Sequence, residues 1–307
     1  MERRGGSAVR RWGAALTAST AVVAVALPTA TAGAADGPAG IDAKGAYLLD
    51  SKAGQLWGKE ADTERPMAST TKIMTAVVVL DDHAGELDRQ VTIQQSYRDY
   101  VARTQASTAD LRTGDKLTVR QLLYGLMLPS GCDAAYALAD TFGTGDTEAE
   151  RTESFIARMN EKAGELGLHH TRFDSFDGNS SHGGNVASPR DLAVLSRHAL
   201  GNRTFTEVVK SVRSEQKAKN VNRLYTWYNT NKLLGSYDGV IGVKTGSTRS
   251  AGPCLVFAAK RSGREVVGVV LNDRTSRFPD AARMLDYAFR TRTALKLRRL
   301  PASAHED

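Results

Sequence analysis

The sequence predicts an α+β fold in which an antiparallel sheet is completed by strands from both ends of the chain. Strand-like apolar runs occur in residues 45–60 and again after residue 236. The long block between them shows the periodicity of amphipathic and buried helices instead. Because strands and helices are segregated along the chain, we expect a sheet flanked by helices plus an all-helical insert.

The N-terminal part of the predicted sheet is a hairpin. The stretch GAYLLDSKAGQLWGKE (45–60) contains two strand-like runs around a Lys-Ala-Gly turn. It is followed by STTKIMTAVVVLDD (69–82), which has the residues of a helix N-terminus and then an apolar run. Three consecutive valines (77–79) have poor helix propensity, so we expect burial on most sides to hold this helix.

The middle of the chain predicts four more helices. Residues 83–118 form a mixed, turn-rich stretch. The helices are expected at residues 118–128, 132–142, 148–168 and 188–200. Pro129 ends the first of them, and Gly167 closes the third. Ser188 is the expected cap of the last, with Pro189 at its first helical position.

The predicted sheet resumes after residue 236. YDGVIGVKTGS, GPCLVFAAK and REVVGVVLND are strand-like runs, and an RSGR turn joins the last two. DAARMLDYAFRTRTALKL (280–297) has the pattern of a C-terminal helix. These patterns predict a sheet subdomain of about residues 36–66 and 206–290 and a helical subdomain of about residues 67–205.

Residues 1–35 have the features of a signal peptide. Four arginines precede the apolar segment WGAALTASTAVVAVAL (12–27), and PTATAGAA (28–35) offers Ala-x-Ala cleavage sites. The apolar segment is too short for a stable membrane span, and an anchor helix that stays attached is the alternative. We therefore expect an extracytoplasmic protein, either secreted or associated with the cell wall or membrane.

The charge pattern argues against a nucleic-acid partner. The full chain has a net charge of +7, and +4 remains without the four arginines and one glutamate of residues 1–35. Cationic and anionic residues alternate almost everywhere, so no nucleic-acid footprint is expected. The basic first half of the tail (291–307) suits a weak contact with an anionic membrane surface, although a frayed, solvated terminus is the simpler interpretation.

The cysteines and histidines predict neither a metal site nor a disulfide. No Cys/His spacing fits metal ligands, and no His-Glu-x-x-His occurs. Two cysteines in an exported protein are compatible with one disulfide. However, Cys132 opens a helical pattern and Cys254 begins an apolar run. Buried free thiols are the commoner state at such positions.

The first candidate motif is STTK (69–72), whose Ser-x-x-Lys spacing puts a hydroxyl and an amine on one helix face. Serine is a poor nucleophile until a base takes its proton, and a lysine serves as base only where its surroundings lower its pKa. The start of a buried helix supplies such surroundings, and its dipole favours a developing oxyanion. The same spacing in SEQK (214–217) lies in a polar stretch, so the spacing alone is weak evidence.

The second candidate is Ser130 in LPSGC (128–132), where the chain breaks after a helix. A side chain in such a break is able to face a cleft. The alternative is that Ser130 caps the next helix. Taken alone, the capping interpretation is the stronger of the two.

The third candidate is KTG (244–246) at the end of an apolar strand-like run. Lys244 would supply positive potential and Thr245 a hydroxyl for a carboxylate, on a twisted edge strand beside a cleft. Gly246 would let a substrate backbone approach closely. RTG (112–114) is nearly the same tripeptide and is expected only to mark a turn.

In this order, PMASTTKIMTA, LMLPSGCDAAYAL and GVIGVKTGSTRSAGPCL resemble the serine DD-peptidases, the low-molecular-mass penicillin-binding proteins that act on D-Ala-D-Ala peptides. The resemblance covers roughly residues 42–290. The Ser-Gly-Cys form of the second motif is similar to the streptomycete DD-transpeptidase type. The resemblance implies the fold shared with serine β-lactamases, with the active site between the sheet and the helical subdomain.

The resemblance also implies catalytic roles. Ser69 would be the nucleophile that forms an acyl-enzyme and releases the terminal D-alanine. Lys72 would be its general base. Ser130 would relay a proton to the leaving nitrogen, with help from Lys244. No metal or organic cofactor takes part.

Substrate-binding roles follow from the same resemblance. Thr245 would bind the terminal carboxylate of the substrate, assisted by Arg249. The backbone N–H groups of Ser69 and Ser247 would form the oxyanion hole. The family's second motif is usually Ser-x-Asn, so Cys132 stands where an Asn is expected, and a thiol hydrogen-bonds more weakly. Substrate positioning and the choice of acceptor are the properties that this change affects.

The implied partners are peptidoglycan stem peptides and β-lactams, bound by a monomer. A β-lactamase is one alternative, but the class A pattern Glu-x-x-Leu-Asn is only approached by ELGLH (165–169), at a helix end. A non-catalytic wall-binding protein of the same fold is another, and the intact serine and lysine motifs argue against it. An unrelated Ser-His-Asp hydrolase is excluded because Gly-x-Ser-x-Gly is absent.

Overall fold

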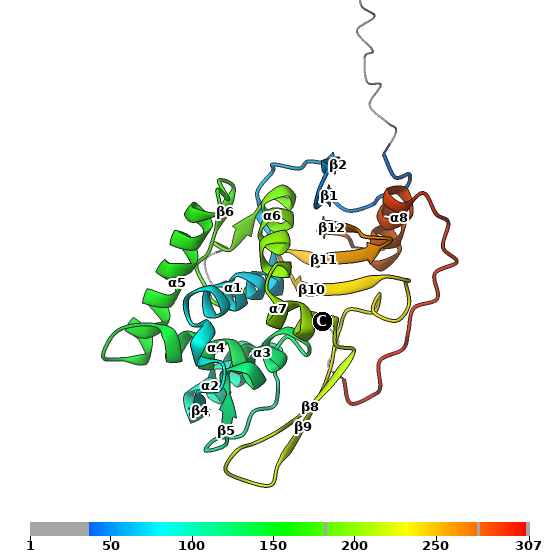
Figure 1. The fold of residues 1–307 in the computed structure, drawn as a ribbon. Helices are drawn as coiled ribbons and strands as arrows, with labels where there is room; N and C mark the ends of the chain where they lie inside the picture. The colour runs from blue at the N-terminus through cyan, green and yellow to red at the C-terminus, as the bar shows by residue number, and fades with distance from the viewer. Residues whose placement is uncertain (1–36, 181–182, 275–276, 305–307) are drawn as a thin grey trace, which may run out of the picture. The chain divides into compact units, whose positions relative to one another are not determined.

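Strands from both ends of the chain form one five-stranded antiparallel sheet, in the order β10-β11-β12-β1-β2 (Figure 1). They are β1 (Gly45–Asp50), β2 (Gly54–Lys59), β10 (Val240–Thr248), β11 (Gly252–Arg261) and β12 (Arg264–Leu271). The N-terminal hairpin joins the C-terminal strands because β1 pairs with β12. The predicted α+β architecture is confirmed, and β10, which carries the KTG motif, is an edge strand.

The structure, a computed structural model, describes residues 37–180, 183–274 and 277–304. The predicted signal peptide and its cleavage sites lie outside the described residues. No helix in the described part of the chain is long and apolar enough to span a membrane. The chain from Asp36 to Asp307 groups as one compact unit, so the boundary between a sheet and a helical subdomain stays a prediction.

Both faces of the sheet are covered, which explains why β11 and β12 are apolar along most of their length. Successive residues of a strand point to opposite faces, and so Val256 and Phe257 belong to two different hydrophobic clusters. Helix α8 (Arg277–Phe289) packs on β11 and β12 in one cluster. Helix α6 (Pro189–Leu200) packs on β1 and β12 in the other.

The helical block of the chain surrounds one buried helix. Its members are η1 (Ala68–Thr71), α1 (Lys72–Asp82), η2 (Ala84–Glu86), α2 (Gln95–Thr104), α3 (Val119–Met127), α4 (Cys132–Phe142), α5 (Glu148–Glu165) and α7 (Arg203–Lys210). Helix α1 contacts α3, α4, α5 and α6, and its residues from Lys72 to Leu80 are all buried. Burial therefore holds the valine-rich segment helical, as expected. Ser188 caps α6, also as predicted.

Several helices and strands of the structure were not predicted from the sequence. Helix α2 lies inside the stretch that was expected to be turn-rich, and Tyr97 is its only buried residue. Helix α7 has only eight residues. The hairpin of β8 (Arg213–Lys217) and β9 (Leu224–Tyr228) extends away from the main sheet (Figure 1). The remaining strands are short: β3 (Arg65–Pro66), β4 (Gln90–Thr92), β5 (Lys116–Thr118), β6 (Thr171–Arg172) and β7 (Val186–Ala187).

The C-terminal helix is shorter than predicted, and the expectation that it continues to residue 297 is wrong. Helix α8 ends at Phe289, and Arg290 takes a left-handed backbone conformation with φ of 55°. The Asp286 carboxylate accepts hydrogen bonds from the Thr293 N–H and the Thr291 hydroxyl. These side-chain hydrogen bonds give the residues after Phe289 partners in a non-helical conformation. They therefore compete with the continuation of α8.

The tail after α8 is also not a frayed, solvated terminus over residues 291–304. Leu295 and Leu297 pack against the cluster beneath α8. The Arg298 N–H donates to Ser236 Oγ at 2.8 Å, and the half-buried Arg298 guanidinium donates to the Asn231 carbonyl at 3.2 Å. Apolar contacts and partly buried hydrogen bonds therefore hold this segment against the rest of the chain.

Candidate active site

The first motif lies where a single 3-10 turn passes into helix α1. Ser69 is in the turn and partly exposed, and Lys72 is the fully buried first residue of α1. Lys72 Nζ donates a hydrogen bond to Ser69 Oγ at 2.9 Å. The predicted pairing of hydroxyl and amine on one helix face is present in the structure.

Lys72 has two further acceptors. Its Nζ lies 3.3 Å from Cys132 Sγ and 2.7 Å from the main-chain carbonyl of Asp177. Three contacts therefore surround the buried amine and fix its position in the protein. The Cys132 contact brings the second motif to the first.

Ser130 lies in the break between α3 and α4, as predicted, and is held in an unusual state. Its backbone is left-handed, with φ of 66°, a conformation that non-glycine residues seldom adopt. Its Oγ is buried and has no hydrogen-bond partner among the described residues. The N-cap of α4 is Gly131, without a side-chain cap, so Ser130 does not serve as a helix cap. A strained backbone and an unpaired hydroxyl together indicate a functional position.

Cys132 is a buried thiol, and so is Cys254; both are free rather than joined in a disulfide. Burial, with the negative charge of Asp177, raises the pKa of Cys132 to about 12 against the opposing effect of Lys72. Burial raises the pKa of Cys254 to about 11. Neither group is therefore a thiolate nucleophile near neutral pH, which agrees with the assignment of the chemistry to serine.

The break around Ser130 is braced by the loop at residues 107–111. Ser107 Oγ donates to the Ser130 carbonyl at 2.6 Å, and the Cys132 N–H donates to the Ser107 carbonyl at 2.9 Å. The buried Asp133 carboxylate accepts from the N–H groups of Ala109 at 2.8 Å and Leu111 at 3.0 Å. These bonds offset the strain of the left-handed residue.

The third motif approaches Ser69 through a glycine. A Cβ on Gly246 would lie 2.9 Å from the backbone N of Ser69, so only glycine lets β10 come this close to the 3-10 turn. Gly178 packs closely against the same turn, since a Cβ added to it would lie 2.1 Å from the Ala68 carbonyl oxygen. The Ser69 backbone is therefore held between two glycines from distant segments.

The remaining residues of the third motif divide into buried and exposed groups. Lys244 and Thr245 are buried, whereas Ser247 and Arg249 are exposed at the end of β10. Thr245 Oγ1 lies 2.6 Å from Thr230 Oγ1. The Thr230 N–H in turn donates to the Leu128 carbonyl at 3.2 Å, just before the break that carries Ser130. All three motifs are thus joined in one region.

A cavity opens beside the Ser69 turn. Its walls include Ala68, Gly178, Asn179 and Arg249. Arg249 is the only predicted site residue in its lining, and its exposed guanidinium is available to an anionic group there.

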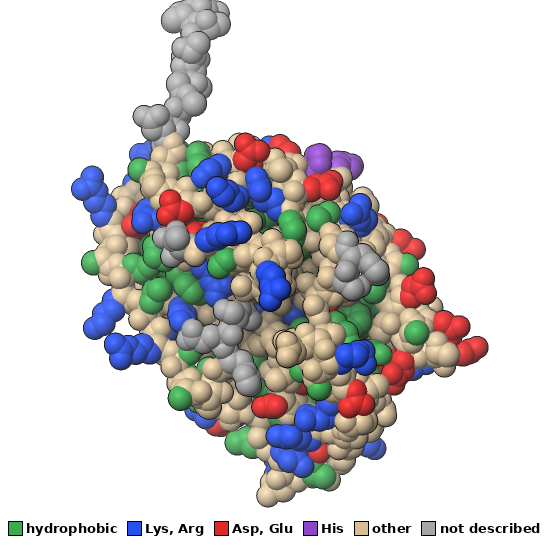
Figure 2. All heavy atoms as spheres, turned by 180° about the vertical axis from the view of Figure 1, so that it is seen from behind, with side chains coloured by type: hydrophobic (Ala, Val, Ile, Leu, Met, Phe, Trp, Pro, Cys, Tyr) green, Lys and Arg blue, Asp and Glu red, His purple; other side chains and the backbone are tan. Residues whose placement is uncertain are grey.

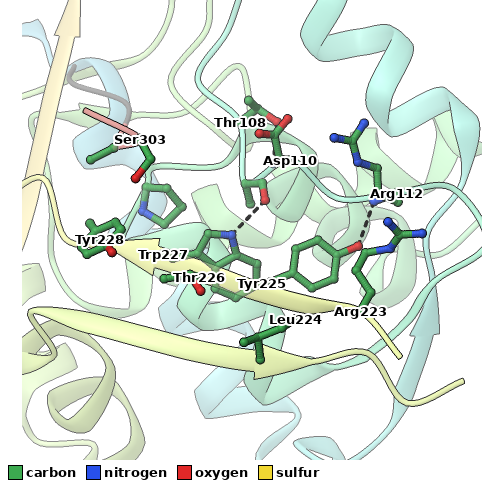
Figure 3. A pocket seen from close by; sticks show the side chains of 13 residues that line it. Thr108, Asp110, Arg112, Arg223, Leu224, Tyr225, Thr226, Trp227, Tyr228 and Ser303 are labelled. Carbon is green, nitrogen blue, oxygen red and sulfur yellow. Dashed lines mark hydrogen bonds between the residues drawn. The ribbon is translucent and has the colours of Figure 1, made fainter. Parts of the chain in front are cut away.

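A second cavity, shown in Figure 3, lies behind the Ser130 break and contains none of the predicted site residues in its lining. Strand β9 forms one wall. Trp227 Nε1 donates to the Ala109 carbonyl at 2.8 Å, and the Arg112 N–H donates to Tyr225 Oη at 3.0 Å. The hairpin therefore supports the loop that braces Ser130.

The alternative motifs have ordinary structural roles. SEQK (214–217) lies on strand β8, and RTG (112–114) lies at a turn, where Gly114 has φ of 85°. Glu165 ends α5, half-exposed, and the neighbouring Arg158 and Lys162 lower its pKa. The described residues contain no cluster of three or more His, Cys, Asp or Glu side chains able to hold a metal.

Sequence reasoning missed four residues of this site: Ser107, Asp177, Thr230 and Tyr100, whose Oη donates to the Asp177 carboxylate at 2.8 Å. No residue type or spacing singled out Asp177 or Thr230 in the sequence. Asp177 and Ser107 contribute main-chain carbonyls, which any residue possesses and no pattern reveals. Tyr100 lies on α2, a helix that the sequence did not predict.

Comparison with known proteins gives the same assignment. The family model of D-alanyl-D-alanine carboxypeptidases matches residues 30–275. The chain belongs to this family. It is 48% identical over 288 residues to a D-alanyl-D-alanine carboxypeptidase of Streptomyces sp. strain K15, covering 92% of this chain and 99% of that protein. It is 34% identical to the D-alanyl-D-alanine carboxypeptidase DacB2 of Mycobacterium tuberculosis, covering 79% and 80% respectively.

Solved structures show the same fold. The crystal structure of the Streptomyces K15 DD-transpeptidase has a TM-score of 0.79 and 52% identity, covering 82% of this chain and 98% of that one. An evolved putative penicillin-binding protein homolog from Mycobacterium tuberculosis has a TM-score of 0.70 and 30% identity, covering 84% and 94%. The predicted family, fold and enzyme class are confirmed: the chain is a serine-type DD-peptidase of the cell wall.

Proposed function

We propose that Ser69 is the nucleophile and Lys72 its general base. The observation that carries this proposal is the 2.9 Å hydrogen bond between Lys72 Nζ and Ser69 Oγ at the start of a buried helix. In its neutral form, Lys72 takes the Ser69 proton as Oγ attacks the carbonyl carbon between the two D-alanines. The C–N bond then breaks, and the terminal D-alanine leaves from an acyl-enzyme on Ser69.

Ser130 relays the proton to the leaving nitrogen, with Lys244 supplying positive potential. The unpaired, buried Oγ of Ser130 supports this role, because a hydroxyl without a protein partner is available to one on the substrate. The Cys132 contact with Lys72 shows that the second motif is within reach of the base. Water as the acceptor then completes carboxypeptidation, and an amino group completes transpeptidation.

The backbone N–H groups of Ser69 and Ser247 form the oxyanion hole in this proposal. The close approach of Gly246 to the Ser69 N supports it, since that approach brings β10 beside the nucleophile. Removing one oxyanion donor typically costs about a hundredfold or more in rate. Thr245 and the exposed Arg249 would bind the terminal carboxylate of the substrate.

Cys132 takes the place of the family's Asn and serves as a weak partner for Lys72. A thiol accepts and donates poorly, so a substrate amide gains less from it than from an Asn side chain. Acylation by Ser69 is retained in this arrangement. The binding of the acceptor is where we expect the thiol to matter.

The substrates are peptidoglycan stem peptides ending in D-Ala-D-Ala, and β-lactams acylate Ser69 as mimics of them. Residues 1–35 direct export, so the mature enzyme works outside the cytoplasm. It acts there as a monomer. Cationic and anionic side chains are interspersed on the face shown in Figure 2. The tail keeps exposed cations for a weak, salt-sensitive contact with anionic lipid, namely Arg290, Arg292, Lys296 and Arg299.

The deciding experiment uses the mature protein and two kinds of ligand. Incubation with a diacyl-D-Ala-D-Ala tripeptide should release D-alanine, and added glycylglycine should divert the acyl group into a new peptide. Benzylpenicillin should leave a stable adduct on the tryptic peptide that contains Ser69. An adduct absent from that peptide contradicts the nucleophile, and rapid repeated turnover of a chromogenic cephalosporin supports a β-lactamase instead.

A further inference from the structure

The shortest of the three Lys72 contacts comes from a residue outside the three motifs. Lys72 Nζ lies 2.7 Å from the Asp177 carbonyl oxygen, compared with 2.9 Å from Ser69 Oγ. The carbonyl belongs to the loop after β6 that also carries Gly178. The position of the amine relative to Ser69 therefore depends on how firmly this loop is held.

The Asp177 side chain is buried as well and is fully hydrogen-bonded. Its Oδ2 accepts from Tyr100 Oη at 2.8 Å. Its Oδ1 accepts from the Asn179 N–H at 2.8 Å and from Ser175 Oγ at 3.2 Å. A buried carboxylate needs such donors, so this network fixes both the side chain and the carbonyl attached to it.

The negative charge of Asp177 reaches the catalytic groups. It is the largest cause, after burial, of the raised pKa of Cys132. Cys132 Sγ is itself 3.3 Å from Lys72 Nζ. The ionisable groups beside the carboxylate are Cys132 from α4 and Tyr100 from α2. Lys72 reaches Asp177 through the main-chain carbonyl.

Side chains from three helices hold the loop, two through aromatic contacts and one through a hydrogen bond. The ring of Phe176, next to Asp177, lies 5.7 Å from the Tyr100 ring and 5.3 Å from the Tyr136 ring, centroid to centroid. Thr75 Oγ1 donates to the Phe176 carbonyl. Helices α1, α2 and α4 thus all contribute to holding the carbonyl that Lys72 contacts.

We propose that Asp177 is a positioning residue for Lys72 and that Tyr100 holds Asp177 in place. This inference rests on the proposed role of Lys72 as base. The Asp177 carbonyl aims the amine at Ser69. When Lys72 takes the proton from Ser69 Oγ, the same carbonyl accepts a hydrogen bond from the ammonium that forms. The order of nucleophile, base and orienting group is the one that activated serines require.

The test separates acylation from binding in the mature enzyme. Asp177→Asn keeps the carbonyl and the side-chain shape but removes the charge. We expect the acylation rate constant for benzylpenicillin to fall about tenfold or more, since hydrogen bonds and contacts with charged groups are worth about 1.5–3 kcal/mol. The dissociation constant of the preceding non-covalent complex should stay within about twofold. Tyr100→Phe should lower the same rate constant several-fold.

Tyr97→Phe is the matched control. Tyr97 is a buried tyrosine on the same helix and donates to another carboxylate, that of Asp140, at 2.5 Å. Removing the Tyr97 hydroxyl should lower the melting temperature about as much as Tyr100→Phe does, without changing the acylation rate constant. A structural role for Tyr100 would instead make the two variants alike in both measurements.

Two outcomes overturn the inference. One is an Asp177→Asn enzyme that keeps the wild-type acylation rate constant. The other is a Tyr97→Phe enzyme as slow as Tyr100→Phe. Parallel penicillin labelling of a Ser69→Ala enzyme distinguishes failure of this inference from failure of the proposed function. If Ser69→Ala abolishes labelling while the Asp177 and Tyr100 variants acylate normally, only this inference fails; if Ser69→Ala still labels, the proposed function fails.

Discussion

Two Ser-x-x-Lys segments occur in this chain, at 69–72 and at 214–217, and the structure shows a contact between the two side chains only in the first. At 69–72, a 3-10 turn that passes into a helix places Ser69 Oγ and Lys72 Nζ 2.9 Å apart. Residues three apart on a helix share one face, whereas on a strand they point to opposite faces. The same spacing therefore gives different geometry in the two places.

The strand segment shows the consequence. On β8, Ser214 is partly buried and pairs with Trp227, whereas Lys217 is exposed and pairs with Leu224. Lys72, in contrast, is buried and contacts three acceptors. Secondary structure and burial, and not spacing, give the pair at 69–72 the geometry that the proposed nucleophile and base require.

The largest expected effect comes from removing each serine in turn. Ser69→Ala should abolish covalent labelling by fluorescent penicillin, because no other hydroxyl takes the place of the attacking one. Ser214→Ala should label like the wild type. Gel fluorescence after a fixed exposure measures both, and persistent labelling of Ser69→Ala would assign the nucleophile elsewhere.

The two lysines give the next test. Lys72→Met keeps much of the side-chain volume but removes the base, and we expect acylation to slow by about 10²- to 10⁴-fold. Lys217→Met changes an exposed side chain and should leave the rate within about twofold. Stopped-flow acylation kinetics measure the ratio. If Lys72→Met and Lys217→Met changed the acylation rate equally, the proposal that only the segment at 69–72 is catalytic would be contradicted.

A smaller effect should follow from widening the contact between β10 and the 3-10 turn. Gly246→Ala puts a methyl group 2.9 Å from the Ser69 N, so backbone atoms have to shift. We expect acylation to fall about tenfold or more through misplacement of the nucleophile, with a stability loss of about 1–3 kcal/mol.

Gly164→Ala is the control for that change. This glycine lies in α5, where a Cβ would meet no atom within 4 Å. The variant should acylate normally and gain up to about 1 kcal/mol in unfolding free energy. Urea unfolding and acylation kinetics together check the pair. A Gly246→Ala enzyme as fast as the wild type would show that the close approach is dispensable.

The smallest effect is expected at Cys132, the partner of Lys72 that the strand segment lacks. Cys132→Asn should retain acylation and change its rate only several-fold, because an amide is able to replace the thiol next to Lys72. Its larger effect should be on the fraction of acyl groups transferred to glycylglycine. A Cys132→Ala enzyme that cannot be acylated at all would contradict this secondary role.

The parts of the fold that were predicted correctly have a strong apolar signal. Strands β11 and β12 are covered on both faces, and α1 is buried on nearly all sides, so their sequences are apolar almost throughout. Helix α2 and strand β8 have polar sequences that pack through few side chains, and no pattern marks them. The C-terminal helix was extended too far because Asp286 ends it through side-chain bonds that the apolar periodicity does not reveal.

The site was predictable to the extent that its chemistry resides in side chains. Ser69, Lys72 and Ser130 were proposed from residue types, their order and the family resemblance that the three motifs carry, and the structure brings these segments together. The contribution of Asp177 includes a main-chain carbonyl, and that of Gly178 is the absence of a side chain. Only the folded chain shows which residues make such contributions.

The two glycines that enclose Ser69 have a consequence for how activity appears as the protein folds. The turn at Ser69 is completed only when the loop at Gly178 and the edge strand at Gly246 have both reached it. The Lys72–Asp177 bond alone spans 105 positions of sequence. A partly folded chain therefore has the nucleophile but not its surroundings. The rate at which penicillin labels a refolding sample then measures how fast the last distant segment packs against the Ser69 turn.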